Sequence, residues 1–199
     1  MDNLTQDVLA YTRVTRCEME ITSVDLDSLI AEVIEQYPML VSSAGRIRVH
    51  HPLGCAKGHV PSLIQCFSNL LGNAVKFVPE GRAPHVEVRA TVEAQRRRVW
   101  VKDNGVGIDP ADQTRIFRMF ERAAGKKVPG TGIGLAIVKK AVERMGGSVG
   151  VISTVGNGAE FWIELDLASS PCASVATTRN LASFWSDSPI NRIQISAAT

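Results

Sequence analysis

Apolar residues recur at spacings of three and four positions in four segments, the pattern of a helix with one buried face. The first segment covers residues 3–20, and the second follows Asp25, a residue type that favours a helix start. The third opens at Pro61, where the missing N–H of proline costs no helical hydrogen bond. The fourth follows the glycine-rich run 130–134 and ends at the glycine pair 146–147. The pattern therefore predicts one N-terminal helix and three later helices.

Strict alternation of apolar and polar residues predicts strands between and after these helices. Residues 86–92 and 99–101 alternate on either side of an arginine run, which indicates a hairpin with one buried face. Residues 149–151 and 161–167 alternate around a Gly-Asn-Gly turn, and residues 46–50 form a shorter strand-like segment. Together the elements predict an α/β fold, a two-layer sandwich. In it a mixed, mostly antiparallel sheet is covered on one face by three helices and preceded by one amphipathic helix.

The predicted elements divide the chain of 199 residues into three parts. Residues 1–22 hold the first helix, which cannot bury its apolar stripe alone and must pack on the following domain or belong to a bundle completed elsewhere. Residues 23–167 hold the sandwich. Residues 168–199 contain seven serines, only three charged residues and no regular period, which predicts a flexible C-terminal tail.

Composition and charge narrow the classes of function. The 22 basic and 20 acidic residues nearly cancel, so the charge gives no reason to expect a nucleic-acid partner. No apolar run approaches the roughly 20 residues that cross a bilayer, and the start of the chain lacks the basic region of a signal peptide. We therefore expect a cytoplasmic chain without membrane contact of its own, while a parent protein could be anchored through another segment.

Candidate chemistry gathers in three clusters, of which the first lies on the third predicted helix. Asn69, Asn73 and Lys76 have helical spacing and share one face of that helix. Amide oxygens can ligate Mg²⁺ and an ammonium group can meet phosphate oxygens, so this face suits a metal-bound polyphosphate. A solvated helix face can have the same residues, and for this cluster alone both interpretations stay open.

The other two clusters are rich in glycine. The sequence DNGVGID at 103–109 follows a predicted strand, and its glycines allow close approach of the backbone to a flat ligand. Asp103 could accept a hydrogen bond from an exocyclic amino group such as that of adenine, although DNG is also a common turn. The sequence GTGIGL at 130–135 opens a helix, where free N–H groups and the helix dipole favour phosphate. It matches neither the P-loop nor the dinucleotide-binding pattern.

In this order and at these spacings, the three clusters resemble the N, G1 and G2 boxes of the ATP-binding domain of sensor histidine kinases, within the gyrase, chaperone and histidine kinase ATPase superfamily. Residues 116–122, with the sequence IFRMFER, are similar to the F box of that family. The resemblance covers residues 23–167 and implies a Bergerat-type ATP-binding fold with ATP and Mg²⁺ as cofactors.

The resemblance also implies roles for individual residues. Asn73 would ligate Mg²⁺, and Asn69 and Lys76 would act beside the phosphates as catalytic residues. Asp103 would accept a hydrogen bond from the adenine amino group, and Arg122 with residues 123–131 would form a short ATP lid. The other residues that would contact ATP are Phe77, Gly105, Gly107, Ile108, Phe117, Gly130, Thr131, Gly132, Gly134 and Leu135.

The residue four positions before the metal ligand distinguishes reactions within this superfamily. Hydrolysing members have a glutamate there that activates water, whereas this chain has Asn69, whose amide cannot act as a base. The resemblance therefore implies a protein-histidine kinase that transfers the γ-phosphoryl group of ATP and mainly positions Mg-ATP and screens its charge. A serine kinase or ATPase of the same superfamily and a non-catalytic nucleotide-dependent interaction module remain alternatives.

The histidine that accepts the phosphoryl group in this family lies on a dimerisation helix and is followed by an acidic, an apolar and a basic residue. None of the four histidines of this chain has that context. Helix 3–20 resembles the second dimerisation helix. The resemblance thus implies a catalytic fragment whose partners are the phosphoacceptor histidine domain of its parent kinase and a downstream response regulator. Pairing of helix 3–20 with a second copy would give a homodimer.

Overall fold

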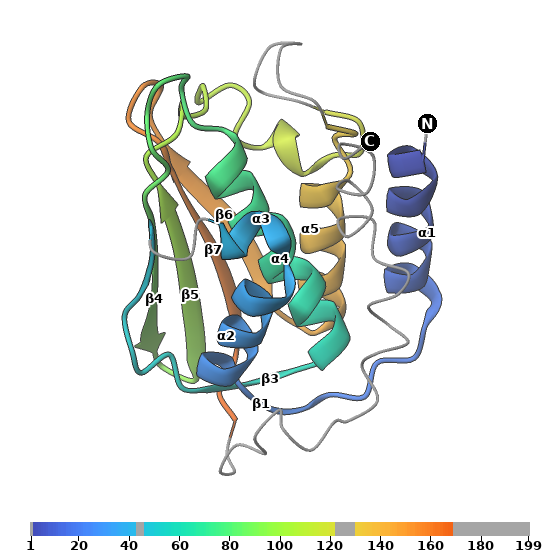
Figure 1. Ribbon diagram of the computed structural model, residues 1–199. Helices are drawn as coiled ribbons and strands as arrows, with labels where there is room; N and C mark the ends of the chain where they lie inside the picture. The colour runs from blue at the N-terminus through green and yellow to red at the C-terminus, as the bar shows by residue number, and fades with distance from the viewer. Residues whose placement is uncertain (1, 43–45, 122–129, 169–199) are drawn as a thin grey trace, which may run out of the picture.

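The computed structural model describes residues 2–42, 46–121 and 130–168, which form two layers with one further helix packed beside them (Figure 1). The helices are α1 Asp2–Arg16, α2 Leu26–Gln36, α3 Pro38–Val41, α4 Val60–Lys76 and α5 Gly134–Arg144, with a short 3-10 helix at Arg115–Phe117. The strands are β1 Thr22–Asp25, β2 Ile47–Val49, β3 Cys55–Gly58, β4 Val86–Glu93, β5 Arg96–Asp103, β6 Ser148–Ser153 and β7 Ala159–Asp166.

The main sheet has five strands in the order β2-β4-β5-β7-β6, of which only β2 and β4 run parallel. β1 and β3 form a separate antiparallel pair, and a bridge between Ala56 and Leu167 connects this pair to the end of β7. Helices α2, α4 and α5 lie across one face of the main sheet (Figure 1). The predicted sandwich with a mixed, mostly antiparallel sheet is confirmed.

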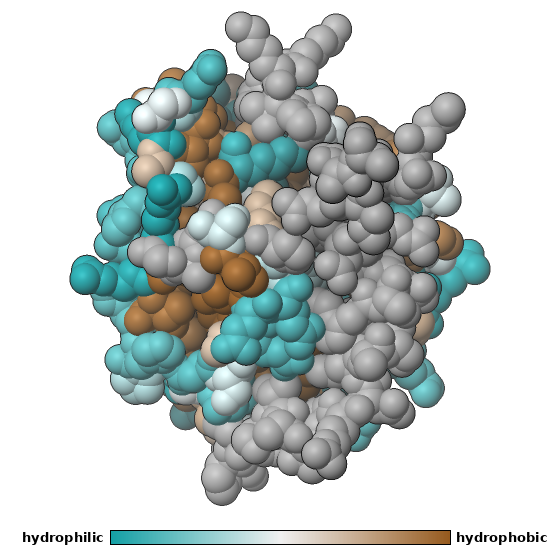
Figure 2. Space-filling view, viewed as in Figure 1, coloured by the Kyte–Doolittle hydropathy of each residue, from teal (hydrophilic) through white to brown (hydrophobic). Residues whose placement is uncertain are grey.

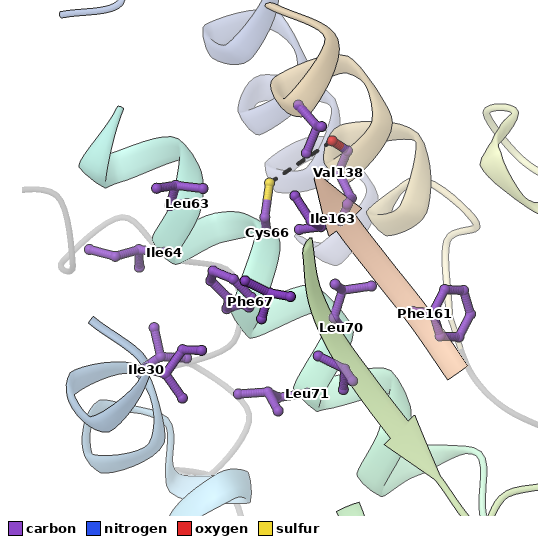
Figure 3. Packing of buried hydrophobic residues seen from close by; sticks show 14 of the residues in the cluster. Ile30, Leu63, Ile64, Cys66, Phe67, Leu70, Leu71, Val138, Phe161 and Ile163 are labelled. Carbon is purple, nitrogen blue, oxygen red and sulfur yellow. Dashed lines mark hydrogen bonds between the residues drawn. The ribbon is translucent and has the colours of Figure 1, made fainter. Parts of the chain in front are cut away.

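The core lies between the sheet and α4, the helix that packs against both α2 and α5. Of the 17 residues of α4, 11 are buried, and Cys66 among them donates through its thiol to the carbonyl oxygen of Val138 in α5. Figure 3 shows the residues that meet there from α2, α4, α5 and β7, namely Ile30, Leu63, Ile64, Phe67, Leu70, Leu71, Val138, Phe161 and Ile163. This burial fixes the rotation of α4 and leaves Asn69, Asn73 and Lys76 partly exposed.

Two predicted helix starts are confirmed. Asp25 caps α2, because its Oδ1 accepts a hydrogen bond from the Asp27 N–H at 3.1 Å, and its Oδ2 accepts from Ser28 Oγ at 2.8 Å. Pro61 lies in the first turn of α4, where it removes no helical hydrogen bond.

The β4–β5 hairpin forms as predicted, but the arginine run lies within β5 instead of beside it. The turn occupies the two residues before Arg96 and includes Ala94 at a φ of 52°. Arg98 stacks 4.4 Å from the ring centroid of Trp162 and donates to Glu164 at 2.6 Å and 2.9 Å. The run therefore forms part of an ion-paired and stacked sheet face.

The strands β1 and β3 and the short helix α3 were not predicted from the sequence. β3 has the sequence CAKG and β1 has the sequence TSVD, and neither shows the alternation of valine and isoleucine that marks β4. Their pairing depends on contacts between residues at least 30 positions apart, such as Thr22 with Gly58. No pattern within either segment indicates such a contact.

α1 packs on α5 (Figure 1), and this contact buries only the C-terminal part of its apolar stripe. Val14 is buried, and Arg144 of α5 donates to the carbonyl oxygens of Val14 and Cys17 at 2.6 Å and 2.8 Å. Leu4 and Leu9 of α1 stay 48% and 52% exposed. Figure 2 shows that polar side chains interrupt the apolar surface on the helical side of the molecule. None of the helices in the described ranges is long and apolar enough to span a membrane.

Candidate functional site

The three polar clusters of the sequence meet at one end of the sandwich. A Cβ atom placed on Gly134, at the start of α5, would lie 2.9 Å from Asn69 Oδ1, and one on Gly130 would lie 3.2 Å from Lys76 Nζ. A Cβ atom on Gly105, after β5, would lie 2.5 Å from the carbonyl oxygen of Phe77. The end of α4 therefore contacts both glycine-rich segments directly, as the resemblance implies.

Asp103 ends β5 and holds the loop that follows it. Its Oδ1 accepts hydrogen bonds from the N–H groups of Gly105 at 2.8 Å and Ala159 at 3.1 Å. Within the described residues, no donor reaches its Oδ2. Burial raises the pKa of Asp103 above the ordinary value of an aspartate, although the two N–H donors act in the opposite direction. One carboxylate oxygen thus fixes the loop, and the other is available to a ligand.

The loop 105–108 is pressed between the end of α4 and the β6–β7 turn. Val106 donates from its N–H to Phe77 at 3.0 Å and accepts at its carbonyl from Gly156 at 2.8 Å. Gly107 has a φ of +73°, and a Cβ atom there would lie 2.1 Å from the carbonyl oxygen of Thr154. The sequence suggested that these glycines make room for a flat ligand. In the structure the atoms that Gly105 and Gly107 approach are those of the protein backbone.

Ser153, at the end of β6, contributes to this loop and was not predicted. Its hydroxyl accepts from the Ile108 N–H at 2.8 Å and donates to the Gly158 carbonyl at 2.7 Å. Gln113 donates to the Ser153 carbonyl at 2.8 Å, which adds a second connection between the two segments. In the sequence Ser153 is a polar residue at a strand end, and no motif distinguishes it from other serines.

The polar face of α4 presents two amides with different surroundings. Asn69 donates from its side-chain amide to the Gln65 carbonyl at 2.9 Å, which turns its Oδ1 toward Gly134. No hydrogen bond joins the side chain of Asn73 to another described residue, so its amide oxygen is available to a metal ion. Lys76 lies with its ammonium 5.4 Å from the centroid of the Phe77 ring and close to Gly130.

The glycine turn before α5 leaves the helix start open. Gly132 has a φ of +74° and packs against Phe120 and Glu121, and its carbonyl accepts from the Phe120 N–H at 2.9 Å. Among the residues that the structure describes, no side chain caps the start of α5. The first N–H groups of the helix, including that of Leu135, therefore keep their capacity to bind an anion.

Two predicted ATP contacts and the lid need separate comment. Phe117 is buried and packs edge-to-face on Phe161 with ring centroids 6.4 Å apart, and Ile108 packs partly buried against the same core. Both side chains pack in or against the hydrophobic core next to the site. Their contact with a nucleotide stays a prediction. Arg122 lies outside the described residues, as does most of the predicted lid, 123–131.

The described residues contain no group of three or more histidine, cysteine, aspartate or glutamate side chains that could hold a metal ion. Mg²⁺ does not need such a group, because it commonly keeps several waters and binds through one or two protein oxygens together with substrate phosphates. The amide of Asn73, on the same face of α4 as Asn69, whose Oδ1 lies against the start of α5, fits that mode of binding.

Comparison with known proteins places the chain in one family. Residues 58–169 match the family of histidine kinase-, DNA gyrase B- and HSP90-like ATPases, and the chain belongs to that family. The resemblance on which the sequence prediction depended is thereby confirmed.

Named relatives make the relationship more specific. The chain is 33% identical over 166 residues to cyanobacterial phytochrome A of a Nostoc species, a match that covers 83% of this chain and 22% of that protein. It is 42% identical over 137 residues to the sensor histidine kinase AruS of Pseudomonas aeruginosa, covering 60% of this chain and 13% of that protein. The crystal structure of full-length ShkA in complex with AMPPNP matches with a TM-score of 0.69 at 33% identity, over 85% of this chain and 36% of that chain. The chain spans less than a quarter of the length of these two curated relatives.

Proposed function

We propose that the chain is the ATP-binding catalytic domain of a two-component sensor histidine kinase, which positions Mg-ATP for transfer of the γ-phosphoryl group to a histidine outside this chain. The observation that carries the proposal lies at one end of the sandwich, where, among the described residues, no donor reaches Asp103 Oδ2, no hydrogen bond holds the amide of Asn73, and no side chain caps the start of α5. The relatives named as sensor histidine kinases support the same reading.

The proposed roles divide the site into an adenine side and a phosphate side. On the adenine side, Asp103 Oδ2 accepts from the exocyclic amino group, and the loop held by Gly105 and Gly107 forms the adjoining wall. On the phosphate side, Lys76 and the first N–H groups of α5 receive the phosphates. These contacts with Gly130, Thr131, Gly132, Gly134 and Leu135 follow from the resemblance and from the open helix start.

Mg²⁺ would be held by the amide oxygen of Asn73, with phosphate oxygens and water as the remaining ligands. Bound there, it would neutralise charge on the transferring group. Asn69 takes the position of the hydrolytic glutamate, and its Oδ1 already faces the helix start. An amide at that position cannot remove a proton from water, so transfer to another acceptor is favoured over hydrolysis.

We further propose the division 1–22, 23–167 and 168–199, with α1 as part of a dimerisation domain. The exposed Leu4 and Leu9 of α1 supply an apolar surface for the missing half of a helical bundle, from the parent kinase or from a second copy. Three of the histidines make local hydrogen bonds or ion pairs instead of lying free on a helix. His51 pairs with Asp27, His59 with Ser62 and His85 with Glu87.

Calorimetry with a non-hydrolysable ATP analogue, with and without Mg²⁺, tests the binding step. A second assay adds the dimerisation domain of a related kinase, with its acceptor histidine, and follows radiolabelled phosphate from ATP. We expect Mg²⁺-dependent binding, transfer to the histidine, and no steady-state release of phosphate without the acceptor. Absence of Mg²⁺-dependent binding would remove the proposal, while phosphate release without an acceptor would favour an ATPase.

A further inference from the structure

An acidic side chain of α1 lies at the phosphate side of the candidate site. Asp7 and Thr131, 124 positions apart in the sequence, are joined by a hydrogen bond in which Thr131 Oγ1 donates to Asp7 Oδ2. The charge of Lys76 acts on the same carboxylate and, with the hydroxyl, opposes the effect of burial, which raises the pKa of Asp7.

The packing of α1 on α5 places Asp7 there. Asp7, Tyr11 and Val14 follow one another at helical spacing and share the face of α1 that lies toward α5. Val14 is held near the end of α5 through Arg144, and Asp7 lies two turns earlier, beside the turn that starts α5. The two helices therefore run in the same direction (Figure 1).

The groups around Asp7 are those that would bind the phosphates of ATP. Lys76 and the hydroxyl of Thr131 both favour an anion, and a hydroxyl has only one hydrogen to donate. A carboxylate and a polyphosphate carry charge of the same sign, so each weakens the binding of the other at one place. We propose that Asp7 is an internal competitor of the nucleotide phosphates, so that α1 docked on α5 lowers ATP affinity and bound ATP loosens α1. This inference rests on the proposed function of the site.

α1 is attached in a way that permits such an exchange. Residues 17–21, which connect α1 to β1, belong to no helix or strand. On α1 itself, Val14 is buried, whereas Ala10 and Tyr11 are only partly so. A modest gain in binding free energy at the phosphate site can therefore offset the free energy of the contacts that α1 loses.

The variant Asp7→Asn tests the inference by removing the charge and keeping the shape. The amide oxygen of the new side chain can still accept from Thr131, so α1 can still dock. The matched control is Glu18→Gln, which removes the same charge from an exposed position just after α1. Calorimetry with a non-hydrolysable ATP analogue and Mg²⁺ should show binding at least about fivefold tighter in Asp7→Asn. Glu18→Gln should match the wild type, and affinity for adenosine, which has no phosphates, should be equal in all three.

A second variant tests docking itself. Val14→Asn weakens the contact of α1 with α5 without adding charge, and it should also tighten binding of the ATP analogue. Asp7→Asn in that background should add less than it does alone, because both changes relieve the same competition. Hydrogen exchange of residues 2–16 in the wild type should become faster when the analogue binds.

The outcomes separate this inference from the proposed function. If the wild type binds the analogue and Asp7→Asn binds it equally or more weakly, the competition is refuted, and weaker binding would make Asp7 part of the Mg-ATP site. Unchanged exchange in residues 2–16 on binding would also contradict it. If neither the wild type nor the variants bind, the proposed function fails, and this inference fails with it.

Discussion

The substitution Asp103→Asn should change which nucleobase the site prefers. Oδ1 of Asp103 holds the N–H groups of Gly105 and Ala159. An asparagine must keep its oxygen at these two donors, because turning the amide round would leave both without an acceptor. Its Nδ2 then takes the place of the free carboxylate oxygen. There a donor would face the amino group of adenine, which is also a donor.

The size of the effect follows from the bond that is lost. A hydrogen bond to a charged group contributes about 1.5–3 kcal/mol, so its loss weakens ATP binding roughly 10- to 150-fold. ITP has a carbonyl oxygen in place of the adenine amino group, and this oxygen can accept from the new Nδ2. The ratio of ATP to ITP affinity should therefore fall at least about tenfold.

Calorimetry with both nucleotides and Mg²⁺ measures this ratio, and thermal unfolding checks the fold. Burial raises the pKa of Asp103, so its ionised form costs stability at neutral pH, and the variant should unfold at an equal or higher temperature than the wild type. An equal loss of ATP and ITP binding would mean general damage to the site. An ATP affinity within about threefold of wild type would refute the role of Asp103 in binding adenine.

Three further predictions concern pH, backbone shape and loop support. ATP affinity of the wild type should fall as the pH drops through the raised pKa of Asp103. Over the same pH window, the stability of the wild type relative to Asp103→Asn should rise, because the folded state binds the proton more tightly than the unfolded state. Calorimetry across pH measures the affinity, and thermal unfolding across pH measures the stability. Gly107→Ala should lower the free energy of unfolding in urea by at least about 3 kcal/mol, because its Cβ would meet a backbone oxygen 2.1 Å away. The control Gly146→Ala, at a φ of +76° with no atom within 4 Å, should lower it by about 1–2 kcal/mol. Equal losses of stability would contradict the close approach at Gly107. Ser153→Ala should weaken ATP binding roughly fivefold, because the Ile108 N–H loses its acceptor. Ser148→Ala is the control, because the hydroxyl of Ser148 bonds Glu164 at 3.2 Å, and this variant should bind ATP as the wild type does. Equal affinities of the two variants in calorimetry would refute the role of Ser153 in positioning the loop.

The sequence predicted those parts of the site whose evidence is local. Asp103 directly follows an alternating strand, and the glycines of 130–134 directly precede a helix, so their positions could be inferred without tertiary information. Ser153 and Asp7 could not be found in this way. Their contacts join residues 45 and 124 positions apart, and nothing near either residue indicates the partner.

The same limit explains the glycines of the G1 loop. Their type and spacing predicted a close approach, but not to which atoms. Gly105 and Gly107 meet the carbonyl oxygens of Phe77 and Thr154, so side chains there would push apart α4 and the β6–β7 turn. The loop would then move relative to Asp103. These glycines act on the nucleotide through the position of the loop.

α5 is the element that connects the N-terminal helix with the candidate site. It begins at the open turn where phosphates would bind, and near its other end Arg144 donates to the carbonyl oxygens of Val14, in α1, and of Cys17, just after it. Asp7 lies on the same face of α1 as Tyr11 and Val14, so α1 cannot leave α5 without removing the carboxylate and exposing Tyr11 and Val14 at once. A partner that binds Tyr11 and Val14 would therefore raise ATP affinity, and bound ATP would make these two side chains more available to the partner, because the two equilibria are coupled reciprocally.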